Sequence, residues 1–354
     1  MPNKQMSHNP LLPNASVCII SARRYGDAII NANFLRAAAN ARPDICWIIW
    51  TKPEFAPLFE LMGFTNIICS EFPIAGGVPK MVREGGISLI KAIHQLRNMH
   101  LDASIDFIGD SREALLGYLI TGSKHYSPKW SKFHWMYKLI WNYQVPFVNY
   151  ISIASTQDRV YEFIPSLLST LTSNTIHLIS STPSIHYPPK IAFHPFSSQA
   201  FKTWPEKYWQ ELCKLLLGNQ LMPVIFCMPS EESRAQVIFS KIYPQLSIIA
   251  TSSLNQLIKE IESIDLLVGV DSFLVHLAAA LNKKTIVINA GNLPAWWQAP
   301  NSIALGQSGG CAAYPCANAA ICLGKINESQ CIKSIEPKQV MAAINAALSQ
   351  TSLV

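Results

Sequence analysis

Short apolar runs alternate with segments of helical spacing along the first third of the chain. Four runs have the length and the β-branched or aromatic content of buried strands, at residues 16–20, 45–50, 66–70 and 104–109. After the first run, residues 27–41 carry apolar positions at helical intervals. This alternation predicts a parallel sheet with helices on both faces.

The same pattern recurs after residue 190. Five more strand-like runs follow, KIAFHPF, MPVIFCM, LSIIAT, DLLVGV and KTIVINA, separated by helix-like segments at about 205–219, 231–242, 254–263 and 272–282. Two halves of this kind predict an α/β protein with two doubly wound, Rossmann-like domains.

A serine- and proline-rich stretch, residues 180–189, separates the halves and predicts a linker, because proline is excluded from sheet interiors. We therefore expect an N-terminal domain over 16–179 and a C-terminal domain over 190–332. Residues 1–15 lack an apolar segment of signal-peptide length and predict a flexible tail. A last helix within 333–354 is expected to pack back on the N-terminal domain.

Composition narrows the class of protein. The 354 residues are 49% apolar and 14% charged, which is typical of an ordered globular protein with room for two cores. The net charge of +6 suits small anionic ligands or an anionic membrane face, and lacks the dense basic tracts of nucleic-acid binders. No apolar run is long enough to predict a membrane-spanning helix. We expect a cytoplasmic protein, soluble or peripheral at the inner face of the membrane.

Ligands of open α/β sheets bind beyond the carboxyl ends of the strands, so polar residues there are candidate site residues. Asp27 follows the first strand at the start of a helix, where it can either cap the helix or act as a general base. Ser197, Ser198 and Lys202 follow the strand at 190–196, and their hydroxyls and charge can hold phosphate oxygens.

Two further strand ends in the second half carry acids. Glu231 opens a helix, where it can stabilise the helix dipole or contact a sugar hydroxyl. Asp271 and Ser272 can cap the helix that follows the strand ending at Val270. His276 lies one turn into that helix, as a structural histidine or as a group facing the same crevice.

Four cationic residues near the ends of the N-terminal strands are candidates to hold an anionic acceptor, namely Arg23, Arg24, Arg112 and Lys124. The alternative for each is a solvated position on the protein surface. The segment 129–143 interleaves lysines with aromatic residues. It suits either a membrane interface or, more simply, packing against the domain.

The nine cysteines fall into two groups. Five lie inside apolar runs and are expected to act as small hydrophobes, namely Cys18, Cys46, Cys69, Cys213 and Cys227. Four lie in a glycine-containing loop with C-x4-C-x5-C-x8-C spacing, namely Cys311, Cys316, Cys322 and Cys331. These four can hold a structural zinc or iron ion, or remain thiols or form disulfides.

Several segments together resemble one family. VDSFLVHLAAALNKKTIVI resembles the D-T/S-x-x-x-H-L-A-A-A-L segment of the ADP-heptose:lipopolysaccharide heptosyltransferases, and HPFSSQAFKTWPEKYWQEL resembles their phosphate loop. RRYGDAIINANFLRA, SIDFIGDSREALLGYLITG and PCANAAICLGKINESQCIKSIEPKQV are similar to three other parts of that family. The resemblance runs from about residue 16 to 350 in the family's order.

The resemblance implies a GT-B glycosyltransferase, inverting and metal-independent, whose two domains face a central cleft. The N-terminal domain would hold an anionic glycan or glycolipid acceptor, and the C-terminal domain an ADP-heptose-like donor. The product would be a bacterial surface glycan such as lipopolysaccharide core. A protein-modifying transferase of the same fold, or a catalytically silent nucleotide-sugar-binding protein, is the alternative.

The resemblance also implies roles for the candidate residues. Asp27 would take a proton from the acceptor hydroxyl, and Asp271 would bind hydroxyls of the donor sugar. Glu231 would contact the ribose. The remaining donor-site residues would contact the diphosphate, namely Ser197, Ser198, Lys202, Ser272 and His276. Phe196 and Phe273 depart from the family pattern of small residues, and we expect their rings beside the diphosphate and sugar.

Overall fold

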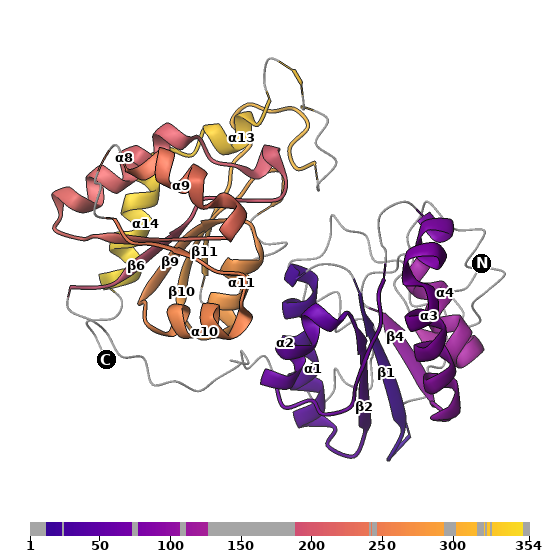
Figure 1. The fold of residues 1–354 in the computed structure, drawn as a ribbon. Coiled ribbons are helices and arrows are strands. Elements are labelled where there is room, and N and C mark those ends of the chain that lie inside the picture. Colours follow the sequence, from indigo (N-terminus) through magenta and orange to yellow (C-terminus); the bar gives the residue numbers. More distant parts are fainter. Residues whose placement is uncertain are drawn as a thin grey trace, which may run out of the picture. The chain divides into compact units, whose positions relative to one another are not determined.

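The chain divides into two compact units, residues 1–176 and 177–354. The computed structural model describes residues 12–22, 25–72, 77–106, 111–126, 188–240, 242, 246–293, 302–316, 322, 324–325 and 328–349. The predicted α/β class and parallel sheets are confirmed in each unit (Figure 1). Arg23, Arg24, the 129–143 segment and most of the proposed linker lie outside the described residues.

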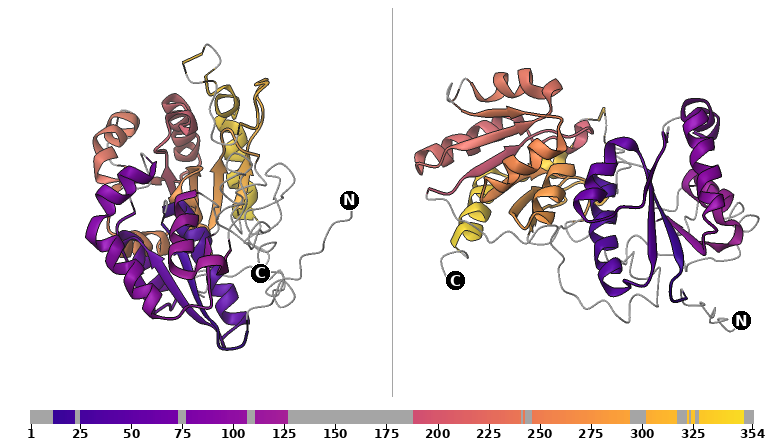
Figure 2. Two further views of the ribbon diagram at one scale, coloured as in Figure 1. Left: turned by 90° about the vertical axis from the view of Figure 1, so that its right-hand side faces the viewer. Right: turned by 60° about the horizontal axis from the view of Figure 1, so that its bottom comes forward.

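The N-terminal unit contains a parallel five-stranded sheet in the order β3-β2-β1-β4-β5. Its strands are β1 (Ser16–Ser21), β2 (Cys46–Thr51), β3 (Ile67–Cys69), β4 (Ala103–Asp106) and β5 (His125–Tyr126). Its helices are α1 (Tyr25–Ala41), α2 (Ala56–Leu61), α3 (Gly77–Asn98) and α4 (Ser111–Thr121). Helices α1 and α2 cover one face of the sheet, and α3 and α4 cover the other (Figures 1 and 2).

The C-terminal unit contains a parallel six-stranded sheet in the order β11-β10-β9-β6-β7-β8. Its strands are β6 (Ile191–His194), β7 (Pro223–Cys227), β8 (Ile248–Ala250), β9 (Leu266–Val270), β10 (Lys284–Ile288) and β11 (Ser302–Leu305). Its helices are α8 (Glu206–Gly218), α9 (Glu232–Phe239), α10 (Leu254–Glu262), α11 (Phe273–Ala280), α13 (Gln330–Lys333) and α14 (Pro337–Ser349).

The last helix, α14, packs against α8 and β10 of its own unit. Val340, Ile344 and Ala347 are buried there in the hydrophobic core. The apolar face of α14 is therefore covered within the C-terminal unit. The expected contact of this helix with the N-terminal domain stays a prediction. A second link joins this region to the β6 side of the sheet, where the buried Trp204 Nε1 donates to the Ile335 carbonyl oxygen at 2.9 Å.

The cysteines within apolar runs are only partly as expected. Cys18, Cys213 and Cys227 are buried, and burial raises the pKa of the Cys213 and Cys227 thiols to about 11. Cys46 and Cys69 are exposed, because they occupy the first position of β2 and the last position of β3. An apolar run predicts a strand more reliably than it predicts burial at the strand's ends.

A buried polar network joins β4, α4 and β5 of the N-terminal unit. His125 has no exposed surface, its Nε2 lies 3.0 Å from Asp106 Oδ2, and its Nδ1 lies 2.7 Å from Ser104 Oγ. Gly117 of α4 lies against this imidazole so closely that a Cβ atom there would overlap the ring. Since both ring nitrogens are held, the ring cannot move aside without breaking hydrogen bonds.

We therefore expect Gly117→Ala to lower the local unfolding free energy by about 1–3 kcal/mol, as overpacking of a filled core does. Amide hydrogen exchange in β4 and α4 measures this change. The matched control is Gly26→Ala on α1, where an added Cβ meets no atom within 4 Å. That change is expected to be neutral or stabilising by about 0.5–1 kcal/mol. Equal protection in both variants would contradict the packing described.

Candidate donor-binding site

The C-terminal unit brings three of the predicted site residues together at the carboxyl ends of two neighbouring strands. Strand β6 pairs with β9, with His194 opposite Gly269. Asp271 therefore follows β9 beside the turn that leaves β6, although Lys202 precedes it by 69 residues. The close pairing depends on Gly269, because a Cβ there would lie 2.8 Å from Val275 and 3.3 Å from the His194 carbonyl oxygen.

Asp271 is the centre of this cluster. Lys202 Nζ donates to Asp271 Oδ2 at 2.7 Å, and His276 Nε2 lies 3.5 Å from Asp271 Oδ1. The side chains of Asp271 and Lys202 are only 10% and 11% exposed. Burial by itself would raise the pKa of Asp271, but the contact with His276 and the charge of Lys202 outweigh it and hold that pKa well below its usual range. The carboxylate is therefore ionised at neutral pH.

Lys202 reaches Asp271 from a single 3₁₀ turn, Ala200–Lys202, between β6 and α8. Phe201 and Lys202 of this turn are both buried. An ammonium group carries three donor hydrogens, so one bond to Asp271 leaves others for phosphate oxygens. The same loop holds Ser197, whose Oγ accepts from the Gln199 amide at 3.3 Å, and the exposed Ser198.

Ser272 lies at the N-terminus of α11 without capping it. Its side chain makes no capping hydrogen bond, and its buried hydroxyl has no partner among the described residues. A buried hydroxyl without a partner is unfavourable unless a ligand or water supplies one. The backbone N–H groups that open α11 lie beside it, so this turn can receive a negatively charged group.

Glu231 already has a backbone partner in the structure. Its Oε2 accepts from the Met228 amide at 3.0 Å and closes the turn after β7. This contact gives Glu231 a structural role in the turn, and its predicted contact with a sugar hydroxyl stays a prediction. Near it, His194 Nδ1 donates to the Phe226 carbonyl oxygen at 3.0 Å. Burial is the main influence on His194 and lowers its pKa, so this imidazole is neutral.

Phe196 does not lie where its position in the sequence suggests. Its ring is 3% exposed and belongs to the hydrophobic core of the C-terminal unit, with the Arg234 guanidinium 5.6 Å from the ring centre. The expectation of a bulky ring beside the diphosphate is therefore corrected for Phe196, because the backbone turns its side chain into the core. Phe273, the first residue of α11, is half-buried.

Two asparagines at the end of β10 complete the surroundings of Asp271. Asn292 Nδ2 donates to Asp271 Oδ2 at 3.3 Å, and Asn289 Nδ2 donates to the Asn292 carbonyl oxygen at 3.4 Å. Both are almost fully buried, and neither side-chain oxygen has a partner among the described residues. These residues escaped prediction from the sequence, although the strand-end rule applied to KTIVINAGN would have found them.

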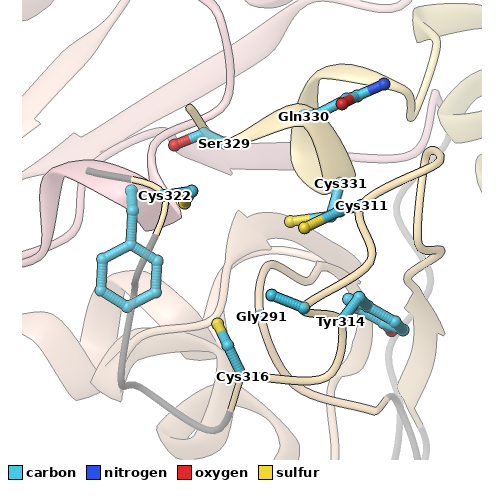
Figure 3. Close-up of a pocket in the computed structure, with 10 residues that line it drawn as sticks. Gly291, Cys311, Tyr314, Cys316, Cys322, Ser329, Gln330 and Cys331 are labelled. Atoms are coloured by element: carbon cyan, nitrogen blue, oxygen red, sulfur yellow. The ribbon is translucent and has the colours of Figure 1, made fainter. Parts of the chain in front are cut away.

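The four loop cysteines line one pocket together with Phe201, Gly291 and Tyr314 (Figure 3). Burial raises the pKa of the Cys316 thiol, and the neighbouring Cys331 adds to the effect. In the part of the chain that the structure describes, no three cysteine, histidine or acidic side chains are placed to hold a metal ion. The four thiols therefore share a pocket, and a structural metal ion on this loop stays a prediction.

The candidate site residues of the N-terminal unit lie on separate elements. Asp27 is half-buried in the first turn of α1, and Arg112 is half-buried in the first turn of α4. Lys124 is exposed in the short turn before β5. Among the described residues, no helix is both apolar and long enough to span a bilayer.

Comparison with known proteins agrees with this architecture. The model of glycosyltransferase family 9 (heptosyltransferase) matches residues 89–322. The E. coli heptosyltransferase WaaC with ADP aligns at 17% identity over 94% of this chain and 99% of its own, with a TM-score of 0.68. A family 9 glycosyl transferase from Veillonella parvula DSM 2008 aligns at 14% identity over 97% and 100%, with a TM-score of 0.75.

A more distant match is the iron-containing dodecameric glycosyltransferase TibC from enterotoxigenic E. coli H10407. It aligns at 13% identity over 97% of this chain and 78% of its own, with a TM-score of 0.56. No curated protein sequence matches the chain.

The two parallel sheets and their structural matches define a GT-B fold. Because the family model spans more than half of its length, the chain belongs to glycosyltransferase family 9, the heptosyltransferase family. The resemblance inferred from the sequence is confirmed.

The depressed pKa of Asp271 predicts how stability varies with pH. The folded-state pKa lies below the value of about 3.9 for an unfolded aspartate. The stabilisation is therefore fully present above that value and is lost as the pH falls toward the folded-state pKa. Asp271→Asn should be less stable than wild type at neutral pH, because Lys202 is left without its carboxylate.

The stability gap should begin to narrow below about pH 5 and be clearly smaller at pH 3, because such a carboxylate loses its contribution progressively between about pH 5 and pH 1. Thermal unfolding of the C-terminal unit across this range measures it. Glu211→Gln, at an exposed position of α8, is the control and should show little gap at any pH. A gap for Asp271→Asn that stays constant down to pH 3 would argue against the buried ion pair.

Proposed function

We propose that this family 9 enzyme is an inverting, metal-independent transferase that moves a heptose-like sugar from a nucleoside-diphosphate donor to a bacterial surface glycan such as lipopolysaccharide core. The observation that carries the proposal is the buried cluster of Lys202, Asp271 and His276 at the N-terminus of α11. It combines a positive charge, a helix N-terminus and a hydroxyl-binding carboxylate, which are the groups that a nucleotide sugar requires.

The diphosphate is assigned to the Lys202 side of the cluster. The ammonium group, the amides that open α11 and the partnerless Ser272 hydroxyl together supply hydrogen-bond donors and positive charge. His276, Ser197 and Ser198 are assigned to the same oxygens. Such donors favour the transition state, because negative charge grows on the leaving nucleoside diphosphate as the glycosidic bond breaks.

The sugar is assigned to Asp271. A carboxylate that stays ionised can accept hydrogen bonds from sugar hydroxyls while it holds Lys202. Glu231 is kept as the ribose ligand, because its Oε1 is not used by the bond from Met228 to Oε2. The structure of WaaC with ADP supports an adenosine diphosphate donor for this chain as well.

Asp27 is proposed as the general base. It would accept the proton of the acceptor hydroxyl while that oxygen attacks the anomeric carbon from the face opposite the diphosphate. One carbon–oxygen bond forms, the bond to the diphosphate breaks with its electron pair, and the configuration inverts. Arg112 and Lys124, with Arg23 and Arg24, are proposed to hold the phosphate groups of an anionic acceptor.

The first experiment separates the two halves of the donor site. Lys202→Ala should weaken ADP and ADP-heptose alike by roughly 10- to 100-fold, the effect of losing a charge-assisted hydrogen bond. Asp271→Ala should weaken ADP-heptose but not ADP, since it removes a sugar ligand and frees Lys202 from its partner. Isothermal titration with each ligand measures both changes.

The matched control for the lysine is Lys214→Ala, which removes the same charge from an exposed position of α8. It should leave both affinities unchanged. If Lys202→Ala and Asp271→Ala weaken ADP to the same extent, the division of roles between phosphate and sugar is wrong.

The second experiment tests the base. Asp27→Asn should keep the affinity for ADP-heptose while turnover falls by about 10²- to 10⁴-fold, because the amide cannot accept the proton. Turnover is measured with lipopolysaccharide core acceptors lacking the transferred sugar. Glu60→Gln, on the exposed surface of α2 in the same unit, is the control and should retain activity. Normal turnover in Asp27→Asn would assign Asp27 to helix capping.

A further inference from the structure

The four-cysteine loop is connected to the donor site through two adjacent backbone carbonyls. The Tyr314 hydroxyl donates to the Asn292 carbonyl oxygen at 2.8 Å, and the Cys316 amide donates to the Gly291 carbonyl oxygen at 2.8 Å. Residues 291 and 292 follow β10, so the four-cysteine loop holds the backbone of Asn292 in place.

The packing at this junction leaves little freedom. Gly291 has φ +73°, and a Cβ there would lie 3.0 Å from Cys316 Sγ and 3.4 Å from the Phe201 ring. Tyr314 packs against the hydrophobic core of the unit, and Asn292 is 1% exposed. Only glycine accommodates both the positive φ and the close approach of the thiol.

Asn292 in turn reaches the cluster around Asp271. Its amide donates to Asp271 Oδ2, the same oxygen that accepts from Lys202. The chain of contacts therefore runs from the Tyr314 hydroxyl through Asn292 to Asp271. Two donors on one carboxylate oxygen fix its rotation more strictly than one, and His276 at Oδ1 completes the constraint.

We propose that Tyr314 and Asn292 are positioning residues that hold Asp271 in the orientation that binds the donor sugar, so that the cysteine loop controls recognition of the sugar. The proposal rests on the assignment of Asp271 to the sugar given above. It gives the cysteine loop a role that does not depend on a bound metal. Lys202, not Asn292, remains the partner of the diphosphate.

A comparison of the affinities for ADP-heptose and for ADP tests the proposal. Tyr314→Phe removes one hydroxyl and keeps the ring in its pocket. Affinity for ADP-heptose should fall roughly 3- to 10-fold, the effect of one lost hydrogen bond, while affinity for ADP is unchanged. Tyr208→Phe on α8 is the matched control, because within the described residues its hydroxyl makes no hydrogen bond and its ring lies against Trp204 and Lys207.

A double-substitution cycle distinguishes positioning from a general structural effect. If Tyr314 acts through Asn292, Tyr314→Phe should have little further effect on ADP-heptose affinity once Asn292→Ala is present. Equal losses for ADP and ADP-heptose in Tyr314→Phe, or losses that add fully to those of Asn292→Ala, would overturn the proposal.

The outcome for the wild-type protein separates this inference from the proposed function. If wild type binds neither ADP nor ADP-heptose, the proposed function fails on its own. The inference is then decided by unfolding free energies of Tyr314→Phe, Asp271→Asn and their combination. Non-additive values support the contact chain from Tyr314 to Asp271, and additive values overturn it.

Discussion

The donor half of this protein depends on one buried ion pair, the contact between Lys202 and Asp271. Two charges with about a tenth of their side-chain surface exposed lose most of their hydration, and an unpaired charge at either position would be costly. Each charge therefore requires the other, which locks the loop after β6 to the loop after β9. The two loops also carry Ser197, Ser198 and Ser272, so this contact joins the two segments to which the donor is assigned.

Much of this arrangement could be predicted from the sequence, because it follows from strand topology. Apolar runs predicted nine of the eleven described strands. The rule that ligands bind at the carboxyl ends of strands selected Lys202, Asp271 and His276, which meet at the aspartate in the structure. The two missed strands, β5 and β11, lie at sheet edges, and β5 has only two residues. Runs this short carry little periodicity.

What escaped prediction depends on where side chains point. Phe196 follows the same strand as Lys202, yet its ring enters the core, and only the backbone path decides this. Asn292 was missed because an amide after a strand is common, and its contact with Asp271 depends on the alignment of β10 with β9. The spacing of the four cysteines left their role open, and only the folded loop shows that they line one pocket with Phe201 and Tyr314.

The hydrogen bond from Trp204 to the Ile335 carbonyl oxygen has a consequence for biosynthesis. Trp204 lies two residues after Lys202, and its partner is 131 residues further along the chain. During translation the phosphate loop therefore emerges long before the carbonyl that anchors it. A ribosome-bound chain that stops before residue 335 can form β6, β7 and β9, but its Lys202 loop lacks this anchor. Nucleotide binding should thus be acquired late in synthesis, after the sheet itself has assembled.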